Sequence, residues 1–175
     1  MPSGKTHDTV TLLLSAPAFS VAYFASNDLR IASLIAAGFL FGGLMFGPDL
    51  DTASRQYSRW GYLRVLWFPY RRFFRHRSRW SHGLIFGAFL RVVYFFGVLT
   101  CAAFLIAYGA TILSGGNLPG ILDFARVWAR LRLFSNWMFG DDGVLFAFAG
   151  IWAGAASHTF TDLAGTYVKT GRKRL

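Results

Sequence analysis

His158 and Asp162 lie four residues apart within a long apolar segment near the C-terminus, and this spacing is suited to metal chemistry. Residues four apart on a helix share one face, so an imidazole nitrogen and a carboxylate oxygen could bind the same divalent cation. Ionisable groups inside an apolar span are costly unless they are paired, and they are usually functional. The pair therefore predicts a metal or catalytic site near the end of this segment.

A second acidic pair, Asp49 and Asp51, directly follows another apolar run. Pro48 disfavours helical backbone before it, and residues two apart in an extended chain point to the same side. We expect both carboxylates to face a shared site, where one of them could bridge two metal ions. The alternative is that the pair only terminates a helix.

The other three histidines also lie beside apolar segments: His7 before the first, and His76 and His82 before a later one. On a continuous helix, the six-residue spacing leaves His76 and His82 about 120° out of register. A break near Ser81 would be needed to bring both inward. Any one histidine could be only a polar tip at a membrane surface, so the prediction rests on the convergence of separate segments.

The composition indicates a membrane protein rather than a soluble domain. Of 175 residues, 54% are hydrophobic, and the 18 Lys and Arg residues cluster beside apolar runs instead of forming a separate basic domain. Membrane topology explains these cations better than nucleic-acid binding does. The eight acidic residues are all Asp, and the lone Cys101 excludes a disulfide or a thiolate metal cluster within one chain.

A helix needs about 20 apolar residues to cross a bilayer core of about 30 Å. The sequence predicts an all-α, polytopic membrane helical bundle with about four transmembrane helices plus interfacial helices, forming a single membrane domain over residues 1–175. The first apolar run has no cleavage site after a basic region, so we expect it to be retained. The expected spans are residues 10–25, 31–46, 84–113 and 144–168.

Two connecting segments are expected to lie on the membrane surface. Residues 52–81 carry eight arginines and many aromatics, which suits the headgroup region, and residues 114–142 contain an amphipathic stretch at 124–134. Thirteen positive residues fall on one side of the predicted topology and four on the other, which places both termini in the cytoplasm. Every histidine and the acidic pair then lie on that face.

Four short motifs together carry a family resemblance. His7, the Pro-Asp-Leu-Asp at 48–51, the residues from His76 to His82, and Ser157-His158 with Asp162 resemble the membrane-bound, metal-dependent hydrolases of the LexA-regulated family. The match is closer still to a sister group of uncharacterised metal-binding membrane proteins of photosynthetic bacteria. This chain departs from the better-known relatives by one extra residue between His76 and His82.

The resemblance implies a divalent metal, zinc before manganese or another ion, in one or two copies. It also implies a bacterial inner or thylakoid membrane and a hydrolase distantly akin to zinc-dependent phospholipase C. Asp51 or His76 is expected to act as bridging ligand or general base, and Arg75, Arg77 and Arg79 are expected to bind substrate phosphate. The expected metal ligands are His7, Asp49, Asp51, His76, His82, His158 and Asp162.

The leading hypothesis is thus a metal-dependent hydrolase of a phosphoester or other ester at the cytoplasmic membrane face, with the lipid bilayer as its partner and no nucleic acid. The alternative is a scaffold or assembly factor whose metal fixes the helix ends without catalysis. A lipid phosphatase with a histidine nucleophile ranks lower, because Trp152 stands where an arginine would be needed. A transporter ranks lower too, because the spans show no paired halves.

Overall fold

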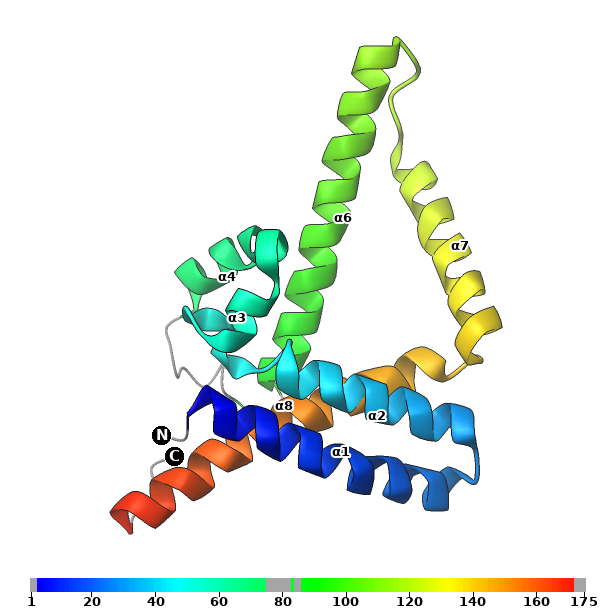
Figure 1. Ribbon diagram of the computed structural model, residues 1–175. Helices are drawn as coiled ribbons and strands as arrows, with labels where there is room; N and C mark the ends of the chain where they lie inside the picture. The colour runs from blue at the N-terminus through cyan, green and yellow to red at the C-terminus, as the bar shows by residue number, and fades with distance from the viewer. Residues whose placement is uncertain (1–2, 75–82, 84–85, 172–175) are drawn as a thin grey trace.

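The computed structural model describes residues 3–74, 83 and 86–171, and every regular element within them is helical. Three long helices, α1 (Gly4–Ser26), α2 (Leu29–Leu44) and α8 (Gly143–Thr170), pack together (Figure 1). The start of α1 and the end of α8 lie at the same end of this three-helix group. The described part of the chain confirms the predicted all-α fold.

A tight turn joins α1 to α2. Asn27 ends α1 in the left-handed conformation, with φ of 51°, and its N–H donates to the Tyr23 carbonyl. Asp28 then caps α2, because its side chain accepts hydrogen bonds from the backbone N–H groups of Arg30 and Ile31. These local interactions explain why the two helices form an antiparallel hairpin.

Glycines allow α2 and α8 to approach closely. A Cβ at Gly42 would collide with the Ile151 carbonyl of α8, and one at Gly154 would collide with the Phe39 carbonyl of α2. Each helix carries a second such glycine four residues earlier, at 38 and 150. Paired small residues at this spacing let helix backbones pack tightly in a membrane.

After α2, the chain folds into four short helices that cap one end of the group. These are η1 (Pro48–Asp51), α3 (Arg55–Arg59), η2 (Gly61–Trp67) and α4 (Phe68–Phe73). Phe46, Leu50, Trp67 and Tyr70 form a buried cluster among them. Residues 52–74 therefore form a packed cap beside the helix ends, and the rest of the predicted interfacial segment lies outside the described residues.

The remaining two long helices, α6 (Phe86–Ser114) and α7 (Ile121–Phe139), project away from this group (Figure 1). The buried residues of α6 all lie near its start, at Gly87, Ala88 and Arg91, and α7 has none. Helix α7 contains the predicted amphipathic stretch and extends beyond it at both ends.

Four helices of the described chain are long and apolar enough to cross a membrane, in agreement with the predicted number. The observed helices extend past the predicted spans at several ends because caps such as Ser3 and Asp28 lie outside the apolar runs. The orientation of the termini stays a prediction.

Candidate metal centre

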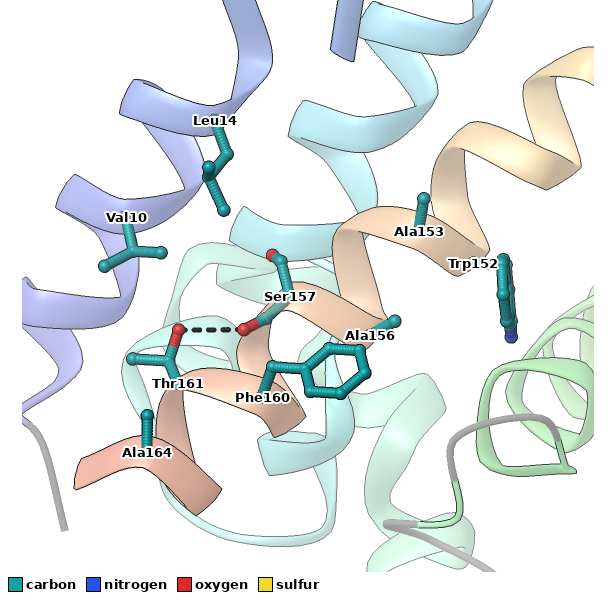
Figure 2. Close-up of a pocket in the computed structure, with 9 residues that line it drawn as sticks. All are labelled: Val10, Leu14, Trp152, Ala153, Ala156, Ser157, Phe160, Thr161 and Ala164. Carbon is teal, nitrogen blue, oxygen red and sulfur yellow. Dashed lines mark hydrogen bonds between the residues drawn. The ribbon is translucent and has the colours of Figure 1, made fainter. Parts of the chain in front are cut away.

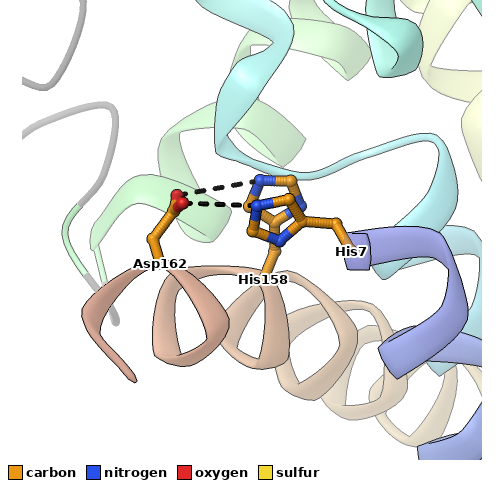
Figure 3. A group of neighbouring side chains, drawn as sticks. All are labelled: His7, His158 and Asp162. Atoms are coloured by element: carbon orange, nitrogen blue, oxygen red, sulfur yellow. Dashed lines mark ion pairs between the residues drawn. The ribbon is translucent and has the colours of Figure 1, made fainter. Parts of the chain in front are cut away.

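His7, His158 and Asp162 converge although they come from opposite ends of the chain (Figure 3). Each offers one ligand atom, and these atoms lie within 4.8 Å of one another. His7 Nε2 is 3.3 Å from Asp162 Oδ1. The two imidazole rings are stacked, with centroids 3.7 Å apart and planes 8° from parallel. The helical spacing of His158 and Asp162 thus places both groups on one face, as predicted.

Asp49 adds a second carboxylate from η1. Its Oδ2 is 3.3 Å from His158 Nε2, and Asp162 Oδ2 is 3.9 Å from the same nitrogen. The site therefore draws on three elements: α1 supplies His7, η1 supplies Asp49, and α8 supplies His158 and Asp162. Their convergence depends on the α2–α8 packing that aligns the end of α2 with this part of α8.

The expectation that Asp49 and Asp51 point the same way is wrong. Residues 48–51 form a 3₁₀ helix rather than extended chain. At three residues per turn, side chains two apart diverge by about 120°. Asp49 faces His158, whereas Asp51 is buried and interacts electrostatically with Tyr70; both carboxylates interact with Arg91. A role for Asp51 as bridging ligand or base stays a prediction.

The cluster has the properties of a cation site. Among the described residues, His158 Nε2 and both oxygens of Asp162 are buried without a hydrogen-bond partner. Two ligands of a tetrahedral zinc ion, each about 2.0–2.1 Å from it, are about 3.3 Å apart. The His7–Asp162 and His158–Asp49 separations of 3.3 Å match that edge, whereas His158 Nε2 and Asp162 Oδ2 are 3.9 Å apart and the ligand atoms of His7, His158 and Asp162 spread over as much as 4.8 Å. The residues present therefore fit a divalent cation.

Gln56 of α3 contacts the His158 ring at Nδ1. Its buried Nε2 donates to the Gly43 carbonyl at 2.7 Å and lies 3.1 Å from His158 Nδ1. If Nε2 of His158 binds a cation, Nδ1 carries the ring hydrogen and needs an acceptor. As placed, the amide N–H groups of Gln56 reach both the Gly43 carbonyl and Nδ1, and a half-turn that presented Oε1 to Nδ1 would give up the bond to Gly43. Gln56 thus couples the ring to the end of α2.

Arg91, near the start of α6, lies close to Asp49 and Asp51. Its side chain is buried rather than extended toward a headgroup layer, and it interacts electrostatically with Tyr70, Asp51 and Asp49. Burial raises the pKa of Tyr70, and the neighbouring Arg91 guanidinium partly offsets this by lowering it. Arg91 therefore compensates the negative charge that η1 brings beneath the site, and it joins α6 to the centre.

Asp8, which follows His7, serves a different purpose. Its Oδ2 accepts from Arg59 at 2.6 Å and pairs with Arg55 at 2.9 Å. Arg59 also donates to the Leu44 carbonyl at 2.7 Å. These bonds fix the first turn of α1 against α3 and the end of α2, and so they position His7.

The structure brings four predicted ligands together: His7, Asp49, His158 and Asp162. Sequence reasoning missed Gln56 and the charge-compensating role of Arg91. Arg91 stands out as a lone charge in an apolar segment, whereas Gln56 lies among polar residues and gave no such signal. The predicted ligands His76 and His82, and the predicted substrate-binding residues Arg75, Arg77 and Arg79, lie outside the described residues.

Comparison with known proteins shows that the chain belongs to a metal-binding family. The model of a family described as "Uncharacterized metal-binding protein (DUF2227)" matches residues 2–172. An uncharacterized protein of Aquifex aeolicus (strain VF5) is 36% identical over 69 residues, which cover 39% of this chain and 47% of that protein. The chain thus aligns with about half the length of this relative. No solved structure matches.

Proposed function

Because the chain belongs to the uncharacterized metal-binding protein family, we propose that it uses a bound divalent cation to hydrolyse a phosphoester or another ester at the membrane surface. His7, His158 and Asp162 would hold the cation, and Asp49 lies beside the position that this leaves for water or substrate. Two imidazoles with carboxylates suit zinc, and manganese is the next candidate. The comparisons support metal binding, whereas hydrolysis is inferred from the geometry of the centre.

The observation that carries the proposal is the uneven burial of the ligands. The side chains of His158 and His7 are 2% and 5% exposed, whereas those of Asp162 and Asp49 are 13% and 24% exposed. Both oxygens of Asp162 are buried, so the accessible side of the centre is the one that carries Asp49, and the imidazole side is closed. A catalytic site keeps one position for water or substrate, whereas a structural site is filled by protein ligands.

The role of each protein group in the proposed reaction follows from its position in the centre. A bound cation would supply a water of lowered pKa and would polarise the ester oxygen. The stacking of the buried His7 and His158 rings holds both of them in place, and Gln56 fixes the orientation of the His158 ring. Asp49, at the accessible side, is placed to accept the proton of the attacking water if it does not ligate. Hydrolysis then adds hydroxyl to the acid fragment and returns that proton to the leaving alcohol.

A structural role is the second candidate, because the centre ties together α1, η1 and α8. A cation bound only for this purpose would stabilise the fold without turning over an ester. The two candidates differ in one measurable property, since only the hydrolase requires turnover at an accessible metal.

The test uses the full-length protein in detergent, freed of metal and then reloaded with zinc or manganese. Release of nitrophenol from bis-p-nitrophenyl phosphate and from p-nitrophenyl esters is followed for the wild type, His158→Ala and Asp123→Ala. Asp123 lies on α7 in an exposed ion pair, so it serves as the matched control. We expect metal-dependent turnover in the wild type and the control, and a loss of at least 100-fold in His158→Ala. Metal binding that raises the unfolding temperature without turnover would favour the structural role.

A further inference from the structure

Thr11 carries a deeply buried hydroxyl group on α1, one turn after His7. Only 1% of the residue is exposed, and its Oγ1 has no hydrogen-bond partner within the part of the chain that the structure describes. Leaving a buried polar group unsatisfied costs about 1–3 kcal/mol. The hydroxyl is therefore unfavourable at this position unless it gains a partner in another state of the protein.

Other threonines in the helices satisfy their hydroxyl groups locally. Thr9, Thr100 and Thr161 each donate to the backbone carbonyl four residues earlier, at 3.0, 2.7 and 2.8 Å. The bond made by Thr161 of α8 is visible in the close-up of this helix (Figure 2). Such bonds are common for threonine inside a helix. Thr11 makes no such bond, so its hydroxyl is available to a different partner.

Thr11 belongs to a layer of small residues next to the stacked histidines. A Cβ built at Gly43 would lie 2.6 Å from Thr11 Oγ1, and one built at Gly154 would lie 2.8 Å from the Gly43 backbone nitrogen. Thr11 is four residues from His7, and Gly154 is four residues from His158, so the layer lies about one helical turn from the ring stack. Because the two glycines have no side chains, Thr11 provides the polar side chain among these three residues.

His7 has a buried ring nitrogen that also lacks a partner. Its Nε2 faces Asp162 at 3.3 Å, whereas its Nδ1 makes no hydrogen bond to any described residue. When a histidine binds a cation through Nε2, Nδ1 carries the ring hydrogen and needs an acceptor. Residues four apart lie one above the other on a helix, so Thr11 shares a face with His7. A hydroxyl oxygen can accept a hydrogen bond while its own hydrogen is donated elsewhere.

We infer that Thr11 is a positioning residue of the metal centre, whose hydroxyl accepts the hydrogen bond of His7 Nδ1, directly or through one water, when His7 Nε2 binds the cation. The inference rests on the metal binding of the proposed function and not on hydrolysis. The two histidines then have separate supports, because Gln56 contacts His158 Nδ1 and Thr11 serves His7 Nδ1. The hydroxyl should therefore matter for metal affinity and not for the stability of the metal-free protein.

Two substitutions at this position separate the hydroxyl from the methyl group. Thr11→Val removes the hydroxyl and keeps the shape of the side chain. Thr11→Ser keeps the hydroxyl and removes Cγ2, which lies against Gly43. The matched control is Thr9→Val, at an exposed position on the same helix. Each full-length protein is freed of metal in detergent, zinc affinity is measured by calorimetric titration, and the unfolding temperature is measured before zinc is added.

We expect Thr11→Val to lower zinc affinity by about 10–100-fold, the range typical for a lost hydrogen-bond partner of a metal ligand. Its metal-free unfolding temperature should not fall, because the hydroxyl makes no bond in that state. Thr11→Ser should show the reverse pattern, with the zinc affinity of the wild type and a lower unfolding temperature, because a buried methyl contact is lost. Thr9→Val should keep the zinc affinity of the wild type.

An unchanged zinc affinity in Thr11→Val, or equal losses of affinity in the valine and serine variants, would overturn the inference and leave the proposed function intact. Failure of the wild type to bind zinc or manganese would overturn both. The expected pattern of affinities without any ester turnover would support the positioning role of Thr11 and refute hydrolysis alone.

Discussion

Helices α8 and α6 are both apolar enough to cross a membrane, yet they differ sharply in how they pack. In its most apolar 18-residue window, α8 has 39% of its residues buried, whereas α6 has 6%. Helix α6 is nevertheless the more apolar of the two by mean hydropathy. Hydropathy therefore predicts which segments enter the bilayer, but close packing depends on small residues and on polar groups that require partners.

The functional consequence follows from that difference. The four assembled ligands lie in or beside the tightly packed group of α1, α2 and α8, and within the described residues α6 contributes only its first turns to the region. Most apolar side chains of α7 and of the outer part of α6 are exposed, and the two helices contact each other through the ring pairs Phe96–Trp128 and Phe104–Phe124. We therefore expect substitutions in the two regions to differ in effect.

The largest effect is expected for Arg91→Ala. This substitution removes a buried guanidinium and leaves the nearby carboxylates of η1 uncompensated, which typically costs about 3–5 kcal/mol. Arg126→Ala on α7 breaks an exposed ion pair with Asp123 and should cost less than about 1 kcal/mol. Thermal unfolding of both variants in detergent measures the difference. Equal losses would refute a buried, charge-compensating role for Arg91.

The next largest effect is expected for Gly154→Val, because the valine side chain would collide with the Phe39 carbonyl at the α2–α8 contact. Overpacking of this kind costs about 1–3 kcal/mol, and it should also displace His158, one turn further along α8. The matched control is Gly97→Val on α6, where a Cβ meets nothing within 4 Å. Unfolding temperature and zinc affinity should both fall for the first variant, and neither should fall for the second.

A subtler effect is expected for Gln56→Ala, which removes the group behind His158 without removing a ligand. Loss of such a supporting contact typically lowers metal affinity by about 10–100-fold. Isothermal titration calorimetry with zinc measures the metal affinity of the variant and of the wild type. An unchanged affinity would show that the ring is held by its stacking on His7 alone.

The smallest effect is expected for Asp28→Ala, because this residue only caps α2 and lies in the turn far from the centre. Loss of an N-cap costs about 1 kcal/mol. The unfolding temperature should fall slightly while zinc affinity stays unchanged. A large loss of zinc binding would indicate that the hairpin turn and the metal centre are coupled.

The sequence was sufficient to predict the helical fold, the number of apolar spans and the convergence of His7, Asp49, His158 and Asp162. Those predictions rest on span length and on helical periodicity, which are local properties. The separation of Asp49 from Asp51 could not be predicted, because it depends on a 3₁₀ turn whose packing beneath Arg91 is a tertiary effect. The sequence does contain a signal for the α2–α8 contact. Each of these helices has two glycines four residues apart, a pattern that predicts close helix packing.

Metal content and coordination of the purified protein test the central claim most directly. Elemental mass spectrometry, combined with X-ray absorption at the zinc edge, is applied to wild type, to the double variant His158→Ala, Asp162→Ala, and to Asp123→Ala. The account predicts about one ion per chain with nitrogen and oxygen ligands in the wild type and in Asp123→Ala, and loss of that ion in the double variant. Absence of bound metal in the wild type after supplementation with zinc or manganese, or equal metal content in the double variant, would contradict it.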